Sequence, residues 1–331
     1  MQKLTVVTPV YNGEKFLKET IESVLNQTFK DFKYIILNDN STDATLSILE
    51  KFQAQDDRIV IVNKVKNEGP ANLRNEGIAM AETNFVALID ADDIAMPTRF
   101  EKQIKVMESN ENLGLCGTWF TIFGDKKEKV IRHSVTHDEL KVQMLNNCGI
   151  GNPTVMLRKN LLGDFKFENR FVPAEDYGMF CEFINKAEFY NIPESLVRYR
   201  WHPNNISQTK EENLRKSEVL IKKRQLENLG ISSENKDFQF YINAVSLKRN
   251  LTFEDIKQTI KASKILKANN LKLHYCNQEL LEKHIDKTIL RTIRNAKIYN
   301  FEYFKYVKNE SGYFSKIKFL DKVVFYLKCV F

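Results

Sequence analysis

The chain has 331 residues, of which 43% are hydrophobic and 11% aromatic, a composition that excludes a disordered protein and allows one large or two modest domains. Its five cysteines are widely spaced and form no CxxC pair, which argues against a disulfide framework or a zinc site. We find no signal-peptide pattern before Tyr11 and no run of about 20 apolar residues that would span a membrane. We therefore expect a cytoplasmic protein.

The net charge of +7 is unevenly distributed along the chain. Residues 1–204 carry 25 Lys and Arg against 29 Asp and Glu, whereas residues 205–331 carry 25 against 14. A basic C-terminal part predicts an anionic partner. Because no nucleic-acid-binding motif or platform of interleaved basic and aromatic residues occurs there, we expect no nucleic acid. An anionic membrane surface, on the inner face of the cell membrane, fits the charge better.

In the first half, short apolar runs alternate with helical patterns. The runs predict strands at 4–10, 34–37, 59–62 and 85–89. Between and after them, helices are predicted at 14–26, 43–52, 72–80 and 97–109. This alternation predicts a largely parallel sheet covered on both faces, with ligands at the carboxyl ends of its strands. That rule selects three loops, at 9–12, 38–43 and 90–93.

Beyond residue 205 the pattern becomes long, charged and helical, at 211–230 and 253–270, with Gly230 as a stop signal. We therefore expect two domains, 1–207 and 208–331. The last segment, 313–331, mixes Phe, Tyr and Val with lysines. It fits either a helix in a membrane interface or a buried terminal helix or strand.

The stretch ALIDADDIAMP places three carboxylates directly after an apolar strand. Carboxylates this close repel one another unless a proton or a cation intervenes. Oxygen ligands suit Mg²⁺ or Mn²⁺, and such an ion keeps open positions for phosphate oxygens. We therefore predict a metal and phosphate site at Asp90 and Asp92. The structural alternative is that Asp92 or Asp93 caps the following helix.

Polar and aromatic residues follow the other strands. Asp39 ends the second predicted strand, where it can accept a hydrogen bond from a base or a ribose hydroxyl. Asn40 tolerates a left-handed turn. Tyr11 can pack against a nucleobase or simply against the protein. Arg74, taken alone, is either a solvated side chain or a ligand for a base or phosphate.

Five segments, TPVYN, NDNSTD, SVLNQTF, ALIDADDIAMP and AEDYGMF, resemble in content and order the signature of the family 2 glycosyltransferases, over about residues 3–207. The resemblance implies an inverting enzyme of the GT-A fold: an α/β protein with a mixed, mostly parallel sheet flanked by helices, here followed by a helical, basic C-terminal region. The segments GNPTVMLR and SLVRYRWHPNNIS also resemble bacterial transferases that extend lipooligosaccharide or capsule chains with hexose or N-acetylhexosamine.

The resemblance implies a role for each matching residue. Asp176 would be the general base, and Asp92 the direct metal ligand of the pair with Asp90. The residues expected around the nucleotide sugar are Pro9, Tyr11, Asp39, Arg74, Asp90, Ala91 and Asp92. The usual DDGSTD is NDNSTD here, so Asn38 cannot act as a carboxylate, whereas Asn40 in place of Gly is a mild change.

The chemistry of inverting transfer also favours Asp176. A single displacement at the anomeric carbon needs one carboxylate opposite the leaving diphosphate to take the acceptor proton. Asp176 begins the helical run YGMFCEFINKA, far from the other aspartates in sequence. Alternatively, Glu175 and Asp176 only favour a helix N-terminus. His202 either completes the metal shell or is a packed loop residue.

We therefore expect metal-assisted transfer of a hexose or N-acetylhexosamine from a UDP-linked donor to a hydroxyl of a growing surface glycan, with Mn²⁺ or Mg²⁺ as cofactor. The acceptor would be a glycan or a lipid-linked glycan. One alternative is an inactive nucleotide-sugar-binding module of the same fold. A haloacid dehalogenase-type phosphatase would need its aspartates near the first strand and Thr or Val where Ile94 stands.

Overall fold

The computed structural model describes residues 2–232, 234–235, 237–246 and 250–330. They form two compact units: residues 1–140 with 148–218, and residues 141–147 with 219–331. The division falls within helices α5 (His137–Gln143) and α9 (Glu211–Glu227). The domain boundary expected at 207/208 stays a prediction, and Phe331 of the expected terminal segment lies outside the described residues.

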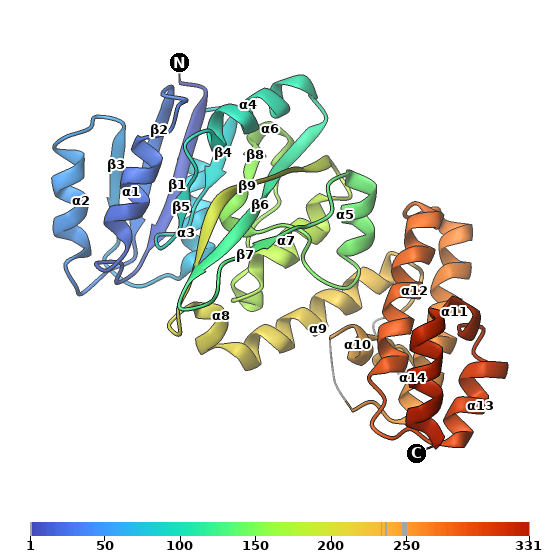
Figure 1. Ribbon diagram of the computed structural model, residues 1–331. Helices are drawn as coiled ribbons and strands as arrows, with labels where there is room; N and C mark the ends of the chain where they lie inside the picture. Colours follow the sequence, from blue (N-terminus) through green and yellow to red (C-terminus); the bar gives the residue numbers. More distant parts are fainter. Residues whose placement is uncertain (1, 233, 236, 247–249, 331) are drawn as a thin grey trace. The chain divides into compact units, whose positions relative to one another are not determined.

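The first unit begins with the four expected strands, β1 (Leu4–Val10), β2 (Phe32–Asn38), β3 (Ile59–Asn63) and β4 (Phe85–Leu88). They pair in parallel in the order β3-β2-β1-β4. The expected helices are α1 (Leu17–Leu25), α2 (Thr45–Gln53), α3 (Pro70–Met80) and α4 (Arg99–Ser109). This half of the unit confirms the prediction from alternating apolar runs and helical patterns (Figure 1).

The sheet continues beyond β4 in strands that the apolar pattern does not separate clearly. Five strands complete the sheet: β5 (Ile94–Ala95), β6 (Leu113–Gly124), β7 (Lys129–Ile131), β8 (Met156–Arg158) and β9 (Glu188–Trp201). The order beyond β4 is β8-β6-β9-β5, with β7 on β6. The β4–β8, β6–β8, β6–β7 and β5–β9 pairs are antiparallel, and β6–β9 is parallel. The sheet is therefore mixed, as expected.

Short helices connect these later strands and lead out of the sheet. These elements are two 3₁₀ turns, at Asn152–Thr154 and Asn169–Phe171, and the helices α6 (Lys159–Leu162), α7 (Glu175–Phe183) and α8 (Ile206–Thr209). Helix α7 is the run that the sequence predicted to begin near Asp176. It brings Glu175 and Asp176 into the same unit as the β4 loop.

Helices cover both faces of the parallel half of the sheet. Even-numbered residues of β1 pack with α1, α2 and α4 in one apolar core, which includes Leu17, Leu49 and Phe100. Helix α3 packs on the opposite face, where Gly77 lies so close to β1 that a Cβ atom would come within 2.4 Å of Val7. Successive strand residues point to opposite faces, so near-continuous apolar strands are required here.

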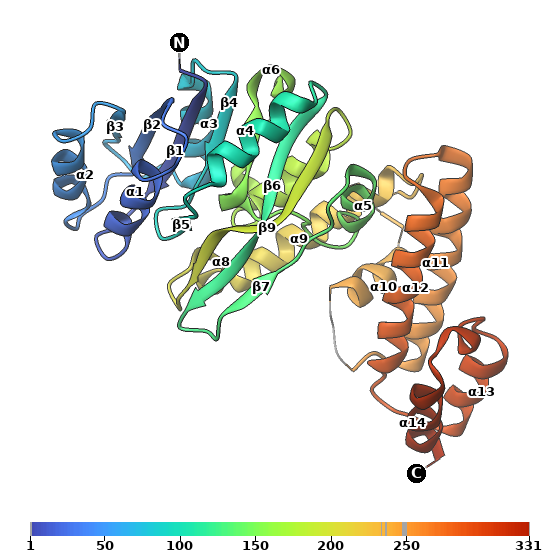
Figure 2. The same ribbon diagram turned by 45° about the horizontal axis from the view of Figure 1, so that its top comes forward.

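The second unit is helical. Its helices are α10 (Asp237–Val245), α11 (Phe253–Leu273), α12 (Gln278–Arg294), α13 (Phe301–Asn309) and α14 (Phe319–Val330), with a 3₁₀ turn at Phe314–Lys316. Side chains of Thr252, Asn277 and Asn300 cap α11, α12 and α13. Figure 2 shows α11 and α12 side by side. Among the described helices, none has the length and apolar character needed to cross a membrane.

Candidate functional site

The carboxyl ends of β1, β2 and β4 bring three of the predicted loops together. Asp39 follows β2, and its amide N–H donates to the carbonyl of Val10 over 2.8 Å. Both oxygens of its buried carboxylate accept backbone N–H groups, from Glu68 at 2.7 Å and Gly69 at 2.9 Å. Gly69 has φ +84°, a conformation that favours glycine at this turn into α3. Asp39 thus fixes the start of the helix that carries Arg74.

The two departures from the DDGSTD pattern have structural roles. Asn38 donates to the side chain of Asn63 over 2.6 Å and accepts the Ser41 hydroxyl over 2.5 Å. Asn40 adopts φ +60°, the left-handed turn expected from its residue type. Neither asparagine needs a negative charge for what it does here.

Arg74 is buried and joins two carboxylates that are far apart in sequence. Its Nη1 lies 2.5 Å from Glu175 Oε1, and its Nη2 lies 2.8 Å from Asp90 Oδ1. In the orientation of its amide that satisfies both partners, Asn152 accepts from Arg74 Nε and Nη2, each over 3.1 Å. The alternative of a solvated Arg74 is therefore wrong. The guanidinium instead holds the β4 loop against α7.

Asp92 pairs with His202, which lies beyond the end of β9. Asp92 Oδ2 is 3.0 Å from His202 Nε2 and accepts from Asn205 Nδ2 over 3.3 Å. Asn205 also accepts the His202 backbone N–H over 2.6 Å, and Phe16 lies against the imidazole with ring centroids 5.2 Å apart. His202 is thus packed in a loop and also placed at the predicted metal ligand. The structure shows the packing of His202, and its role as a metal ligand stays a prediction.

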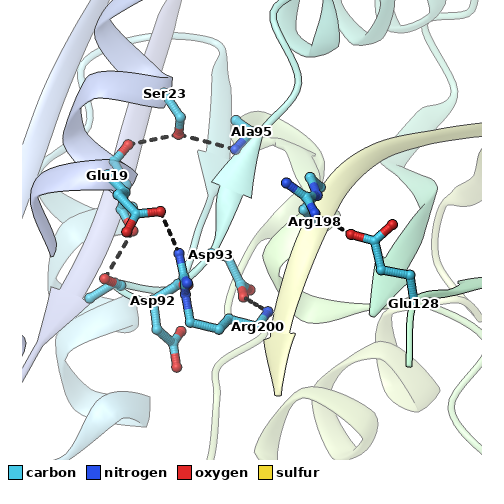
Figure 3. Close-up of polar contacts among 10 residues, drawn as sticks. Glu19, Ser23, Asp92, Asp93, Ala95, Glu128, Arg198 and Arg200 are labelled. Atoms are coloured by element: carbon cyan, nitrogen blue, oxygen red, sulfur yellow. Dashed lines mark hydrogen bonds and ion pairs between the residues drawn. The ribbon is translucent and has the colours of Figure 1, made fainter. Parts of the chain in front are cut away.

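Asp93 and Arg200 hold the acidic turn against β9 (Figure 3). Asp93 is fully buried, and its Oδ1 accepts the Arg200 backbone N–H over 2.7 Å. The Arg200 guanidinium donates to the Asp92 carbonyl over 2.9 Å. It also donates to Glu19 of α1 over 2.8 Å, a contact drawn in Figure 3. Burial raises the pKa of Asp93 well above its usual value, with the neighbouring carboxylates of Asp92 and Asp90 adding to the effect.

The capping alternative for these aspartates is not supported. Helix α4 begins after Thr98, and no side chain caps it. Asp92 and Asp93 instead bond to β9 and to the segment that follows it. These contacts fix the Asp92 and Asp93 carboxylates in place, and neither residue starts a helix.

Asp176 and Glu175 lie in the first turn of α7 but differ in environment. Glu175 is buried on Arg74, whereas Asp176 keeps partial exposure to solvent. Among the described residues, the Asp176 carboxylate accepts one hydrogen bond, from the Tyr177 N–H over 2.7 Å. Desolvation, followed by the Glu175 charge, raises the pKa of Asp176 to about 7, while Arg74 acts in the opposite direction. A carboxylate with this pKa is suited to proton transfer near neutral pH.

The donor set of a divalent ion is partly present. Among the described residues, no group of three or more His, Cys, Asp or Glu side chains is arranged to hold a metal. Asp92 Oδ2 and His202 Nε2 do lie 3.0 Å apart. Adjacent ligands of an octahedral ion with bonds of about 2.1 Å are also about 3.0 Å apart. This separation is also that of the hydrogen bond between the two side chains, so Asp92 and His202 are the residues that would hold such an ion, which would keep positions open for phosphate oxygens and water.

The remaining predicted residues lie along the same edge. Tyr11 is half exposed, Pro9 partly so, and the carbonyl of Ala91 accepts the Thr20 hydroxyl over 2.9 Å. Reasoning from the sequence missed three contributors: Glu175 as the partner of Arg74, and Arg200 and Asn205 as partners of Asp92. Glu175 directly precedes the predicted Asp176 and Asn205 lies three positions after His202, but no spacing rule links either residue to its partner.

The sequence and the fold are similar to those of known glycosyltransferases. A family model described as glycosyl transferase family 2 matches residues 5–167. The *Escherichia coli* protein named UDP-Glc:alpha-D-GlcNAc-diphosphoundecaprenol beta-1,3-glucosyltransferase WfgD is 30% identical over 242 residues, which cover 72% of this chain and 89% of that protein.

Two solved structures share the fold. TarS 1–349 of *S. aureus*, in complex with UDP-GlcNAc, superposes with a TM-score of 0.59 at 21% identity, covering 90% of this chain and 93% of that one. The mannosyltransferase PcManGT of *Pyrobaculum calidifontis*, in complex with GDP-Man and Mn²⁺, superposes with a TM-score of 0.51 at 13% identity, covering 88% and 74%. At these identities the likeness establishes a GT-A-type sheet and its helical C-terminal region.

Proposed function

Because the chain belongs to glycosyltransferase family 2, we propose that it is an inverting enzyme that moves a hexose or N-acetylhexosamine from a nucleotide-diphosphate sugar to a hydroxyl of a growing surface glycan. The single observation that carries the proposal is the cluster in which Arg74 joins Asp90 to Glu175, beside Asp176. This cluster supports the proposal because the acidic turn and a carboxylate of raised pKa lie around the same guanidinium.

In the proposed reaction, the acceptor oxygen bonds to the anomeric carbon as the bond to the diphosphate oxygen breaks. Asp176 takes the proton of the acceptor hydroxyl, so that no alkoxide has to form in advance. Its partial exposure leaves it within reach of an acceptor, whereas Glu175 is committed to Arg74. The two adjacent carboxylates thus have different proposed roles because their surroundings differ.

We propose that UDP is the nucleotide and that Asp39, Tyr11 and Pro9 border its base and ribose. TarS, which binds UDP-GlcNAc with the same fold, supports this choice. The Asp39 carboxylate already accepts two backbone N–H groups, so a further bond to the nucleotide would use its remaining lone pairs. The half-exposed Tyr11 ring offers an apolar surface to a base.

We propose that Asp92 and His202 hold Mn²⁺ or Mg²⁺, with Asp90 oriented by Arg74 beside them. When bound, the ion would neutralise the charge that develops on the leaving diphosphate. Arg74, Asn205 and Arg200 position the carboxylates for that role through the contacts described above. The Mn²⁺ complex of PcManGT supports a divalent cofactor for this fold.

We expect Asp92→Asn to raise the Mn²⁺ concentration needed for half-maximal activity by about 10–100-fold, because an amide oxygen is a poorer ligand than a carboxylate. Titration of UDP release against Mn²⁺ measures the shift. Asp57→Asn, at an exposed carboxylate elsewhere in the same unit, is the control and should leave the titration unchanged. An unchanged Mn²⁺ requirement in Asp92→Asn would remove Asp92 from the metal site.

A panel of nucleotide sugars tests the function itself. We expect metal-dependent release of UDP from UDP-glucose, UDP-galactose or their N-acetylated forms, with inversion at the anomeric carbon of the product. Binding of a UDP-sugar without turnover for any acceptor would instead support the alternative of an inactive nucleotide-sugar-binding module.

The acceptor and its location are also part of the proposal. WfgD is named for an acceptor sugar on a diphosphoundecaprenol carrier, which supports a glycan or lipid-linked glycan acceptor here. We propose that the enzyme works in the cytoplasm, peripherally on the inner face of the cell membrane, and that its basic C-terminal region docks to anionic lipid.

A further inference from the structure

Helix α14 of the second unit presents an apolar surface to solvent. Seven of its residues form this surface, which we call the α14 apolar face: Phe319, Leu320, Val323, Val324, Tyr326, Leu327 and Val330. Phe319 and Leu320 are each 77% exposed, and the other five are between 42% and 52% exposed. Single exposed apolar residues are common, but a contiguous group of this size marks an interaction site.

The opposite side of α14 anchors it to the unit. Phe325 and Cys329 are buried, and the Phe325 ring lies 5.5 Å from Tyr303 and 5.9 Å from Phe304 of α13. At 100° per residue, these two positions lie across the helix from the middle of the α14 apolar face. The helix is therefore fixed on one side by aromatic packing, and the apolar residues that remain cannot be explained by the core of this unit.

Helix α13 contributes one more exposed aromatic residue, Phe301. Phe301 is 52% exposed and stacks on Phe304 with ring centroids 6.3 Å apart. Phe304 in turn contacts Tyr326 at 5.1 Å. The buried Phe304 ring therefore links the exposed Phe301 of α13 to Tyr326 of the α14 apolar face.

Lysines flank this surface. Lys322 and Lys328 project on either side of the α14 apolar face, with their ammonium groups 5.1 Å from the Phe314 ring and 5.2 Å from the Tyr299 ring. Residues 295–330 contain seven lysines and no arginine, against three carboxylates. One of those carboxylates, Asp321, is already paired with Arg294 at 2.5 Å. The rim is therefore basic.

We propose that the α14 apolar face inserts into the interface of an anionic lipid bilayer, with the flanking lysines at the level of the headgroups. An apolar helical face bordered by lysines and lying in the plane of the interface has the properties of a monotopic anchor. The proposal rests on the proposed function, since it supplies the surface by which that enzyme meets a lipid-linked acceptor.

A second copy of the chain fits the α14 apolar face less well than a bilayer does. In a twofold dimer built on this face, the same patch meets itself, so Lys322 and Lys328 of one copy would approach those of the other. Like charges in such a contact oppose association. The flanking lysines are complementary in charge to a negatively charged surface, which the bilayer supplies.

Vesicle co-sedimentation of the full-length protein tests the proposal. We expect binding to vesicles of phosphatidylcholine mixed with phosphatidylglycerol, weaker binding to phosphatidylcholine alone, and weakening by salt. The double variant Leu320→Glu/Leu327→Glu should lower the partition coefficient for the anionic vesicles by about tenfold or more, because two inserting side chains become charged.

The matched control is Leu271→Glu/Leu273→Glu. Both leucines are also exposed, and they end α11, a helix of 21 residues. Phe253, at its other end, contacts Tyr303 of α13, so these leucines lie about 27 Å along the helix from that contact. Vesicle binding should be unchanged in this control.

The proposal is overturned if wild-type protein does not bind the anionic vesicles, or if both double variants bind as wild type does. It is equally overturned if Leu320→Glu/Leu327→Glu converts a dimer into a monomer in light scattering without any vesicle binding by the wild type, because the face would then hold a second copy. Release of UDP from UDP-GlcNAc without vesicles should be equal in all variants. If neither the wild type nor the variants release UDP from any UDP-hexose or UDP-N-acetylhexosamine while vesicle binding is intact, the proposed function is contradicted and the proposed membrane surface is not.

Discussion

Asp176→Asn is expected to lower kcat by about 10³-fold, within the range of about 10²–10⁴ that a positioned general base contributes. The amide has almost the same shape as the carboxylate but cannot take the proton of the acceptor hydroxyl. Affinity for UDP should not fall, because Asp176 is not among the residues proposed to hold the nucleotide. Steady-state transfer together with calorimetric titration of UDP separates the two effects.

The pH dependence of kcat/KM tests the role of Asp176 independently. Asp176 has a pKa of about 7, raised by burial and by Glu175, so below that pH the base carries a proton and cannot accept another. We expect kcat/KM of the wild type to rise with pH through about 7 and then level off. The residual activity of Asp176→Asn should not show this rise with pH.

Stability distinguishes loss of the base from loss of the fold. A folded-state pKa above the unfolded value means that Asp176 reduces stability as the pH rises from about 4 through 7, since the native state must give up a proton that it holds tightly. Asp176→Asn should therefore be no less stable than wild type at pH 8. Glu182→Gln, an exposed carboxylate on the same helix, is the control for activity. Turnover like that of wild type in Asp176→Asn would assign the base to another residue.

Arg74→Met should lower the free energy of unfolding by about 3–5 kcal/mol, the cost of leaving a buried charge without its partner. The Arg74 side chain is 8% exposed and that of Glu175 is 7% exposed, so water cannot replace the lost cation. Asp90 would lose the same partner and with it a defined orientation. Denaturant unfolding measures the stability, and the same protein should show no transfer.

Two further variants make this prediction specific. Lys102→Met breaks a pair with Glu194 whose side chains are 40% and 50% exposed, so it should cost at most about 1 kcal/mol. Arg74→Met/Glu175→Gln should recover part of the loss, because the buried carboxylate is removed together with its partner. Equal losses in Arg74→Met and Lys102→Met would show that the Arg74 pairs are no stronger than a surface contact.

The parts of the fold that could be predicted are those in which one strong local signal decides the outcome. The runs LTVVTPV and FVALI are short, apolar and contain β-branched residues, which favours buried strands. The loops at their carboxyl ends meet because parallel strands end at one edge. Asn40 was expected in a left-handed turn because few other residue types tolerate one.

The second half of the sheet could not be predicted from one sequence. Strand β9 runs from Glu188 to Trp201 with interspersed charged residues, and it pairs with both β6 and β5 across large separations in sequence. The role of Glu175 could not be predicted for the same reason. Its partner, Arg74, lies 101 positions away, and only the folded chain brings the two together. The site residues themselves stay predictions until ligands are placed among them.

The measurement that tests the central claim most directly is the anomalous scattering of manganese in crystals soaked with UDP and Mn²⁺. The account predicts one strong peak beside the carboxylate of Asp92 and the imidazole of His202, with the diphosphate oxygens completing its coordination. UDP bound with no manganese at Asp92, or with the ion held by other side chains, would contradict it.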